Sequence, residues 1–198
     1  MGFTWVRWTG SNRRSNVIRR FVRRSNTSRR EQERGDIKPV AISIAIRRAK
    51  AEEAESIGAC LRSAFEPFRS QYTSDAFNDT VLSTEAVSER MLRMTIYVAI
   101  IFGGEIAGTV ASAREGREGH LRGMAVRPEW QGCSIAEDLL RAAEHDLRAA
   151  GCDRVTLDTT APLQRADRFY RKNGFLPSGR VTDFFGMPLH EYVKQLAL

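Results

Sequence analysis

The chain has 198 residues, 42% of them hydrophobic, which is enough for one domain with a buried core and an extension outside it. No apolar run of about 18 residues occurs, so we expect no membrane-spanning helix. The odd count of three cysteines argues against a disulfide-stapled secreted domain and favours a reducing compartment, the cytoplasm. Histidine is scarce and no Cys-x-x-Cys pair is present, so we expect no metal site.

The net charge of +7 is concentrated at the N-terminus. Residues 1–30 contain nine arginines and no acidic side chain, which leaves 22 basic against 24 acidic residues in the remainder. Charge therefore does not indicate a nucleic-acid-binding surface on the folded part of the chain. We place the boundary between an arginine-rich extension over 1–38 and a folded domain over 39–198.

The extension is rich in Arg, Ser and Asn, a composition typical of disordered segments. One part of it, residues 17–24, would form a helix with four apolar residues on one side and two arginine pairs on the other. We therefore expect the extension to be either disordered or helical. Three roles stay open: an organelle-targeting transit peptide, a basic arm for nucleic acid or anionic lipid, and an extension without function. The four apolar residues are Val17, Ile18, Phe21 and Val22.

The first half of the domain predicts a strand, two helices and a β-hairpin. Isoleucines at alternate positions indicate the strand, and apolar residues at helical spacing indicate a first helix that Pro67 ends. Gly103-Gly104 between two apolar runs is typical of a hairpin turn. The predicted elements are a strand over 40–46, a helix over 49–65, a polar loop over 71–79, a helix over 81–94, and hairpin strands over 95–102 and 105–113.

The second half alternates strands and helices before a final pair of strands. One apolar stripe predicts a long helix that Gly151 ends, and Thr160-Ala-Pro162 is typical of the start of the next helix. Together the two halves predict an α/β fold with a mixed sheet. The predicted elements are a strand over 120–126, a helix over 135–150, a strand over 154–158, a helix from Thr160 to Asn173, and strands over 176–185 and 189–196 joined by Gly186-Met-Pro188.

A strand, a short turn and a helix start meet between Met124 and Ala136. The turn, 131–134, contains a glycine, and the helix that follows presents free backbone N–H groups on one side. Such a helix N-terminus binds phosphate groups through those N–H groups and the helix dipole. Ser134 and Glu137 also match a Ser-x-x-Glu capping box, which would occupy the same N–H groups, so both interpretations stay open.

A second motif, Ala-x-x-x-Tyr-x-x-x-Gly-Phe over 166–175, joins a helix to a strand. Together with the strand over 121–126 and the turn that follows it, this motif resembles the acyl-CoA-binding core of the Gcn5-related N-acetyltransferase (GNAT) superfamily. The resemblance covers about residues 41–196, and its motifs lie within 120–175. It implies a mixed, mainly antiparallel sheet with a splayed central strand pair, flanked by helices.

The resemblance also implies acetyl-CoA as a cosubstrate, with its diphosphate at the turn and its pantetheine between the splayed strands. The Met124 N–H would face and polarise the thioester carbonyl, and the Val126 backbone would pair with the pantetheine amides. The turn departs from the family pattern at Ser134, where glycine is usual. The implied cofactor-binding residues are Met124, Ala125, Val126, Gln131, Gly132, Cys133, Ser134, Ile135 and Ala136.

Two side chains are candidates for proton transfer. Tyr170 matches the tyrosine that donates a proton to the departing CoA thiolate in this family, although a role as a core aromatic would also explain it. His120 is the candidate general base, with Glu118 and Asp158 as weaker ones. Four extended residues, roughly 13 Å, separate His120 from Met124, so contact with the reacting group needs a water molecule or a strand bulge.

The implied activity is N-acetyl transfer from acetyl-CoA to a primary amine of a small molecule or protein. The alternative is a non-catalytic acyl-CoA-binding or regulatory module that the basic extension holds to nucleic acid or membrane. The identity of the acceptor amine and the formation of a homodimer stay open. Five aromatic residues could wall the acceptor side or belong to the core: Phe65, Phe68, Tyr72, Phe184 and Phe185.

Overall fold

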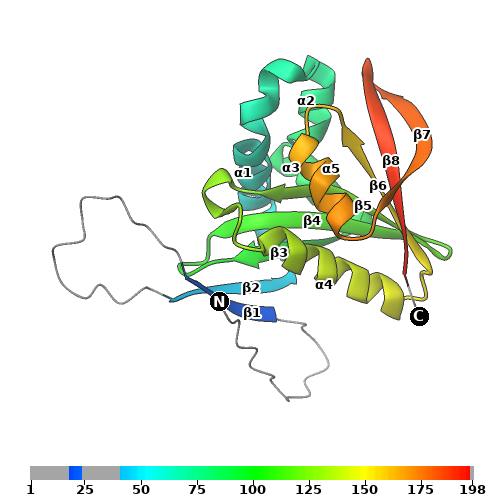
Figure 1. Cartoon of the computed structure of the whole chain (residues 1–198). Helices are drawn as coiled ribbons and strands as arrows, with labels where there is room; N and C mark the ends of the chain where they lie inside the picture. The colour runs from blue at the N-terminus through cyan, green and yellow to red at the C-terminus, as the bar shows by residue number, and fades with distance from the viewer. Residues whose placement is uncertain (1–17, 24–40, 197–198) are drawn as a thin grey trace, which may run out of the picture.

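The computed structural model describes residues 18–23 and 41–196 (Figure 1). An eight-stranded sheet forms its centre, in the order β1-β2-β3-β4-β5-β6-β8-β7. Neighbouring strands are antiparallel except for β5 and β6, which are parallel. The strands are β1 (Ile18–Arg23), β2 (Ala41–Arg48), β3 (Thr95–Ile100), β4 (Ile106–Glu115), β5 (Glu118–Val126), β6 (Arg154–Thr160), β7 (Leu176–Phe184) and β8 (Met187–Gln195).

Helices cover both faces of this sheet (Figure 1). The helices α1 and α3 contribute to one hydrophobic core cluster, and α4 and α5 contribute to another. Within residues 18–23 and 41–196, no helix is long and apolar enough to cross a membrane. The helices are α1 (Ala54–Phe65), α2 (Ser74–Thr80), α3 (Thr84–Arg93), α4 (Ile135–Ala149) and α5 (Gln164–Lys172), with short 3-10 helices at Ala51–Glu53, Glu66–Gln71 and Pro128–Trp130.

The strand β3 shows how the sheet separates the two core clusters. Tyr97 and Ala99 lie in the cluster that contains residues of α4, whereas the alternate residues Ile96 and Val98 lie in the cluster formed with α1 and α3. Side chains alternate across a strand, so a strand that is buried on both faces has an uninterrupted apolar sequence. The apolar run that predicts the first hairpin strand therefore becomes a central strand of the sheet.

The predicted splay between two central strands is confirmed. The ladder between β5 and β6 begins with Glu118 opposite Arg154 and ends with Leu121 opposite Leu157. The strand β5 continues beyond this last pair to Val126, and β6 continues to Thr160. The two strands therefore separate over their second halves, and β6 remains paired there only with β8.

A β-bulge in β5 lies at the point where the two strands separate. Between the pairs Thr109–Ala125 and Ala111–Arg122, β5 contains one residue more than β4. Gly123 lies in this bulge with φ of 64°, in the left-handed region that glycine enters without steric cost. The bulge bends β5 away from β6 and changes the direction of the side chains on either side of it.

Within the N-terminal extension, expected from the sequence to be disordered or helical, Ile18–Arg23 forms the edge strand β1. This strand pairs antiparallel with β2, from Ile18 opposite Ile46 to Arg23 opposite Ala41. A six-residue helix would leave most of its N–H groups without partners, whereas the open edge of β2 offers a partner for every second one. The rest of the extension, including Val17, lies outside the described residues.

Three local predictions differ from the structure in smaller ways. The predicted loop over 71–79 contains α2, whose Ala76 N–H donates to the Thr73 hydroxyl oxygen at 3.3 Å. Thr160 does not begin a helix, because it stays in β6 opposite Leu189, and α5 begins at Gln164. Pro188 lies in β8 rather than in the preceding turn, where its missing N–H is tolerated near the start of a strand.

Candidate functional site

An open pocket of about 210 Å³ lies where β5 and β6 separate. The strand β5 contributes residues 120–124 to its wall, and β6 contributes Asp158, Thr159 and Thr160. The helix α5 closes another side with Ala166 and Tyr170, together with Leu163 just before it. The predicted base His120, the predicted acid Tyr170 and the predicted thioester-binding residue Met124 therefore line the same pocket. The bulge in β5 lies between His120 and Met124.

The turn before α4 has the backbone shape of an anion-binding loop. Gly132 has φ of 81° and Ser134 has φ of 59°, both in the left-handed region. Alternation of left-handed and right-handed residues makes successive N–H groups converge on one point, a concave shape that binds anions. The left-handed conformation of Ser134 also explains why the family pattern has glycine at this position. Serine adopts the same backbone shape here.

The capping-box interpretation of this turn is wrong. The Ser134 side chain makes no capping hydrogen bond. The backbone N–H groups of residues 132–136 have no protein acceptor in the part of the chain that the structure describes. Two carboxylates lie in the first turn of α4, but Glu137 pairs with Lys172 at 3.6 Å, and Asp138 pairs with Arg141 at 2.5 Å. The helix N-terminus can therefore accept an anion.

Buried side chains hold the loop against the sheet. Trp130 and Ile135 belong to the core cluster beneath α4, and Ile135 is 1% exposed. The partly buried Cys133 packs against the same cluster. Because these side chains on either side of the turn are anchored, the N–H groups between them keep their direction before any ligand arrives, and such preorganisation lowers the entropic cost of binding.

The end of β5 has backbone groups directed into the gap. The Arg127 N–H donates to the Ala107 carbonyl at 2.9 Å, so the next pair, Gly108 and Val126, is a non-hydrogen-bonded pair. The N–H and C=O of Val126 therefore point away from β4. Ala125 is different, since its side chain is buried in the core cluster of α1 and α3. Within this part of β5, Val126 offers its main chain to the gap and Ala125 stabilises the sheet.

Gln131 and Arg165 connect the loop to both sides of the gap. The Gln131 side-chain amide donates to the Val126 carbonyl at 3.2 Å, and the Arg165 guanidinium of α5 donates to the Gln131 amide oxygen at 2.7 Å. This chain of contacts places a cation beside the anion-binding turn. Arg165 is absent from the residues that the sequence motifs indicate, because only the packing of α5 brings it to the turn.

Tyr170 packs in the core and also reaches the pocket. Its ring is 7% exposed and packs edge-on against Phe169 and Phe175, with ring centroids 5.4 and 5.6 Å away. It also lines the pocket. Burial raises the pKa of the Tyr170 phenol, so the hydroxyl keeps its proton throughout the neutral range. A protonated phenol at this place can donate a hydrogen bond or a proton.

His120 has partners on both ring nitrogens. Its Nδ1 lies 3.1 Å from the Thr156 hydroxyl oxygen, and its Nε2 lies 3.8 Å from the Asp158 carboxylate. Burial lowers the pKa of His120 and outweighs the opposite effect of Asp158, so the imidazole is neutral at pH 7. The Thr156 hydroxyl can donate to Glu118 or Gly119, each at 3.3 Å, and then accepts from Nδ1. That arrangement leaves the lone pair on Nε2, toward Asp158.

The two weaker base candidates differ in their surroundings. Glu118 forms an ion pair with Arg154, and the pocket wall does not include it. Asp158 lines the pocket, and burial raises the pKa of its carboxyl group. The structure therefore brings Asp158 together with His120 and leaves Glu118 at the paired end of the ladder.

The aromatic residues expected on the acceptor side divide into two groups. Phe65, Tyr72 and Phe184 line the pocket, and Phe68 and Phe185 do not. The Tyr72 hydroxyl and the Thr160 hydroxyl lie 2.6 Å apart, which joins the segment after α1 to the end of β6. The acceptor side is therefore built from α1, the segment that follows it, and the strand β7.

Residues 55–175 match the acetyltransferase (GNAT) family. The chain is 37% identical over 71 residues to the aminoglycoside N(6')-acetyltransferase type 1 of Stenotrophomonas maltophilia. The matched residues make up 36% of this chain and 46% of that protein. It is 31% identical over 88 residues to the IAA acetyltransferase of Azospirillum brasilense. These residues make up 44% of this chain and 58% of that protein. The matched part spans about half the length of these relatives.

The fold is similar to that of the PaiA N-acetyltransferase from Thermoplasma acidophilum, whose crystal structure is a complex with coenzyme A. The similarity has a TM-score of 0.65 at 19% identity and covers 77% of this chain and 98% of that one. At this identity the likeness shows the fold alone. The family match extends over more than half of the chain and includes the turn, the splayed strands and Tyr170. The chain therefore belongs to the acetyltransferase (GNAT) family.

Proposed function

We propose that this protein transfers the acetyl group of acetyl-CoA to the nitrogen of a primary amine, by direct attack within a ternary complex. The main support is the gap between β5 and β6, which has an anion-binding turn at one end and the pocket with His120 and Tyr170 at the other. Such a gap accommodates a long cofactor that carries a diphosphate at one end and a thioester at the other.

The cofactor would lie along the free side of β5. The N–H groups of residues 132–136 would bind the diphosphate, with Arg165 beside them. The Val126 N–H and C=O would pair with pantetheine amides, as a neighbouring strand would. In this arrangement the Met124 N–H faces the thioester carbonyl and stabilises the negative charge that develops on its oxygen.

The reaction needs one proton acceptor and one proton donor. The neutral His120 would take a proton from the ammonium form of the acceptor, directly or through a water molecule, and Asp158 would stabilise the imidazolium. The free amine then attacks the thioester carbonyl carbon, and the carbon–sulfur bond breaks as the tetrahedral intermediate collapses. Tyr170 would donate a proton to the departing thiolate, so that CoA leaves as the thiol, and the second proton that the acylated nitrogen releases would restore the Tyr170 hydroxyl through water.

The acceptor pocket is a hollow between helices and strands, a form that suits a small molecule or the end of a flexible peptide chain. The names of the two curated relatives indicate small-molecule acceptors, an aminoglycoside and IAA. We therefore favour a small-molecule amine over a protein.

Turnover and cofactor binding together test this function. Purified protein is mixed with acetyl-CoA and a panel of amines, and free CoA thiol is measured against a control without amine. Calorimetry measures acetyl-CoA binding separately. An enzyme gives amine-dependent thiol release, whereas a non-catalytic binding module gives heat on titration and no release.

A tyrosine pair sharpens the test. Tyr170→Phe removes only the pocket hydroxyl and lowers kcat by about 10- to 1000-fold, with acetyl-CoA affinity nearly unchanged. Tyr97→Phe is the matched control, because Tyr97 bonds to Asp146 on α4 and lies outside the pocket wall. Equal kcat values for both variants would rule out Tyr170 as the acid.

A further inference from the structure

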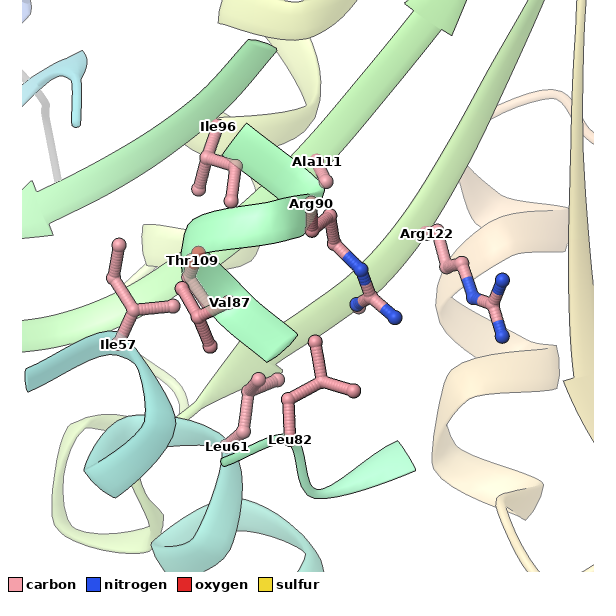
Figure 2. A pocket seen from close by; sticks show the side chains of 10 residues that line it. Ile57, Leu61, Leu82, Val87, Arg90, Ile96, Thr109, Ala111 and Arg122 are labelled. Atoms are coloured by element: carbon pink, nitrogen blue, oxygen red, sulfur yellow. The ribbon is translucent and has the colours of Figure 1, made fainter. Parts of the chain in front are cut away.

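Two arginines meet on the acceptor side of the pocket. Arg90 of α3 and Arg122 of β5 both line it, and Figure 2 shows the Arg90 guanidinium pointing toward the Arg122 side chain. Arg122 forms an ion pair with Asp79 of α2. No carboxylate of the described residues lies within ion-pair distance of Arg90, so the two arginines differ in their partners.

The surroundings of Arg90 are mostly apolar. Leu61, Leu82 and Val87 line the small hollow around its side chain (Figure 2). Burial lowers the pKa of Arg90 to about 10, Arg122 lowers it further, and the more distant Asp79 opposes both, so Arg90 remains charged at pH 7. A partly desolvated cation without a carboxylate in direct contact is costly to the folded protein. An anion that enters the pocket would offset that cost.

Gly123 leaves the Arg90 guanidinium open to the pocket. A Cβ at position 123 would lie 3.1 Å from an Arg90 Nη atom, so the guanidinium rests directly against the bulge backbone. His120 and Arg122 lie two positions apart on β5, which places their side chains roughly 7 Å apart on one face. Arg122, at the cationic end of the acceptor pocket, therefore lies roughly 7 Å along β5 from the predicted base.

The other end of the pocket has the opposite charge. Asp158 faces His120 at 3.8 Å and lines the same hollow. An ammonium group is attracted to this carboxylate, and an anionic group is attracted to Arg90. The remaining charges on the acceptor side, those of Arg122 and Asp79, compensate each other.

We propose that the acceptor is an amino-carboxylic acid, whose carboxylate binds to Arg90 while its amine lies between His120 and Asp158. This inference rests on the N-acetyltransferase function proposed above. A guanidinium binds a carboxylate through two parallel N–H···O hydrogen bonds, which fixes the direction of the acceptor as well as holding it. Polycationic amines without an acid group are poor acceptors, because Arg90 repels them.

Acid and amide forms of the same amines test this inference on the wild-type protein. The standard amino acids, β-alanine and γ-aminobutyrate are each compared with their carboxamides, and CoA thiol release is measured with saturating acetyl-CoA. We expect kcat/KM for the acid of the best pair to exceed that for its amide by about 10- to 100-fold. Equal values for acids and amides would overturn the inference and leave the N-acetyltransferase function intact.

Arg90→Met should remove most of this preference through a higher KM for the acid, while KM for the amide stays nearly constant. Arg93→Met on the same helix is the matched control, since Arg93 is exposed and lies outside the pocket. Arg90→Lys keeps the charge without the paired donors and should retain part of the preference. Weaker binding of acetyl-CoA to Arg90→Met in calorimetry would assign Arg90 to the cofactor and contradict the inference. No thiol release with any amine would instead refute the proposed function itself.

Discussion

Gly108 lies in β4 against the first turn of α4, where the structure has no room for a side chain. A Cβ there would be 2.8 Å from Cγ2 of Ile135 and 3.0 Å from the Ala125 carbonyl oxygen. Carbon atoms in contact stay about 3.5–4.0 Å apart, so Gly108→Ala must move Ile135 by roughly 1 Å. Ile135 is 1% exposed and cannot rotate into solvent. We expect the free energy of unfolding to fall by about 1–3 kcal/mol.

The same displacement should weaken acetyl-CoA binding, because Ile135 is the first residue of α4 and its N–H belongs to the anion-binding turn. A shift of about 1 Å lengthens charge-assisted hydrogen bonds, and we expect the Kd to rise roughly 10- to 100-fold. Calorimetry with acetyl-CoA, well below the melting temperature of each variant, measures this change.

Gly119→Ala is the matched control for Gly108→Ala. A Cβ at position 119 would be 2.5 Å from Cδ1 of Leu147, near the far end of α4, so this variant should also lose stability. It lies at the paired end of β5, away from the turn, and its Kd for acetyl-CoA should match that of the wild type. If both variants bind acetyl-CoA equally well, the turn does not depend on the packing of Ile135, and our reasoning about the phosphate site is wrong.

Three further predictions concern single residues of the site. Because burial holds the pKa of His120 below its ordinary 6.5, the neutral base is lost only when the pH falls below that value. The kcat/KM of the wild type should therefore decline at low pH. His120→Gln should lose this pH dependence and have a rate about 100-fold lower. Ser134→Gly should keep acetyl-CoA affinity within about twofold, whereas Ser134→Val should lower Tm, because a β-branched residue in the left-handed region is strained by about 1 kcal/mol or more. Arg165→Met should raise the acetyl-CoA Kd about two- to fivefold and reduce its dependence on salt in calorimetry, and the exposed Arg168→Met should do neither.

The protonation state of His120 also makes the stability of the fold depend on pH, and protonation lowers that stability. Its folded pKa is lower than its unfolded one, so the folded state binds fewer protons in the pH range just below 6.5. The neutral imidazole therefore contributes fully to stability above that range, and the contribution is lost as the pH falls through the folded pKa. The melting temperature of the wild type should fall more steeply below pH 6.5 than the melting temperature of His120→Gln. An equal dependence of the melting temperature on pH in the two proteins would contradict the burial of this imidazole.

Local chemistry in the sequence predicts most of the fold. Gly103-Gly104 and the apolar runs beside it predict the β3–β4 hairpin, because turn residues and strand patterning act over a few positions. The apolar stripe of α4 and its final glycine predict that helix for the same reason. The turn motif and the spacing around Tyr170 indicate a cofactor site, since both are short-range patterns.

Other features depend on partners that are distant in the chain. Ile18–Arg23 has a pattern compatible with a helix and becomes a strand only because β2 offers it an open edge. The choice between a capping box and an anion-binding turn is made by the left-handed backbone at Ser134. The separation of β5 from β6 is likewise invisible in either strand alone, because it depends on where their ladder ends.

The sequence by itself determined most of the strands and helices of the domain and indicated one candidate phosphate-binding turn, because periodicity, turn residues and helix ends are local properties. The tertiary structure decided how charges meet in the pocket. Asp158 faces His120 only because β5 and β6 lie in parallel register, and Arg90 reaches the pocket only because α3 packs beside α1 next to the bulge. Contacts between residues far apart in the chain have no signature in sequence spacing, so the chemistry of the acceptor side becomes visible only in the folded protein.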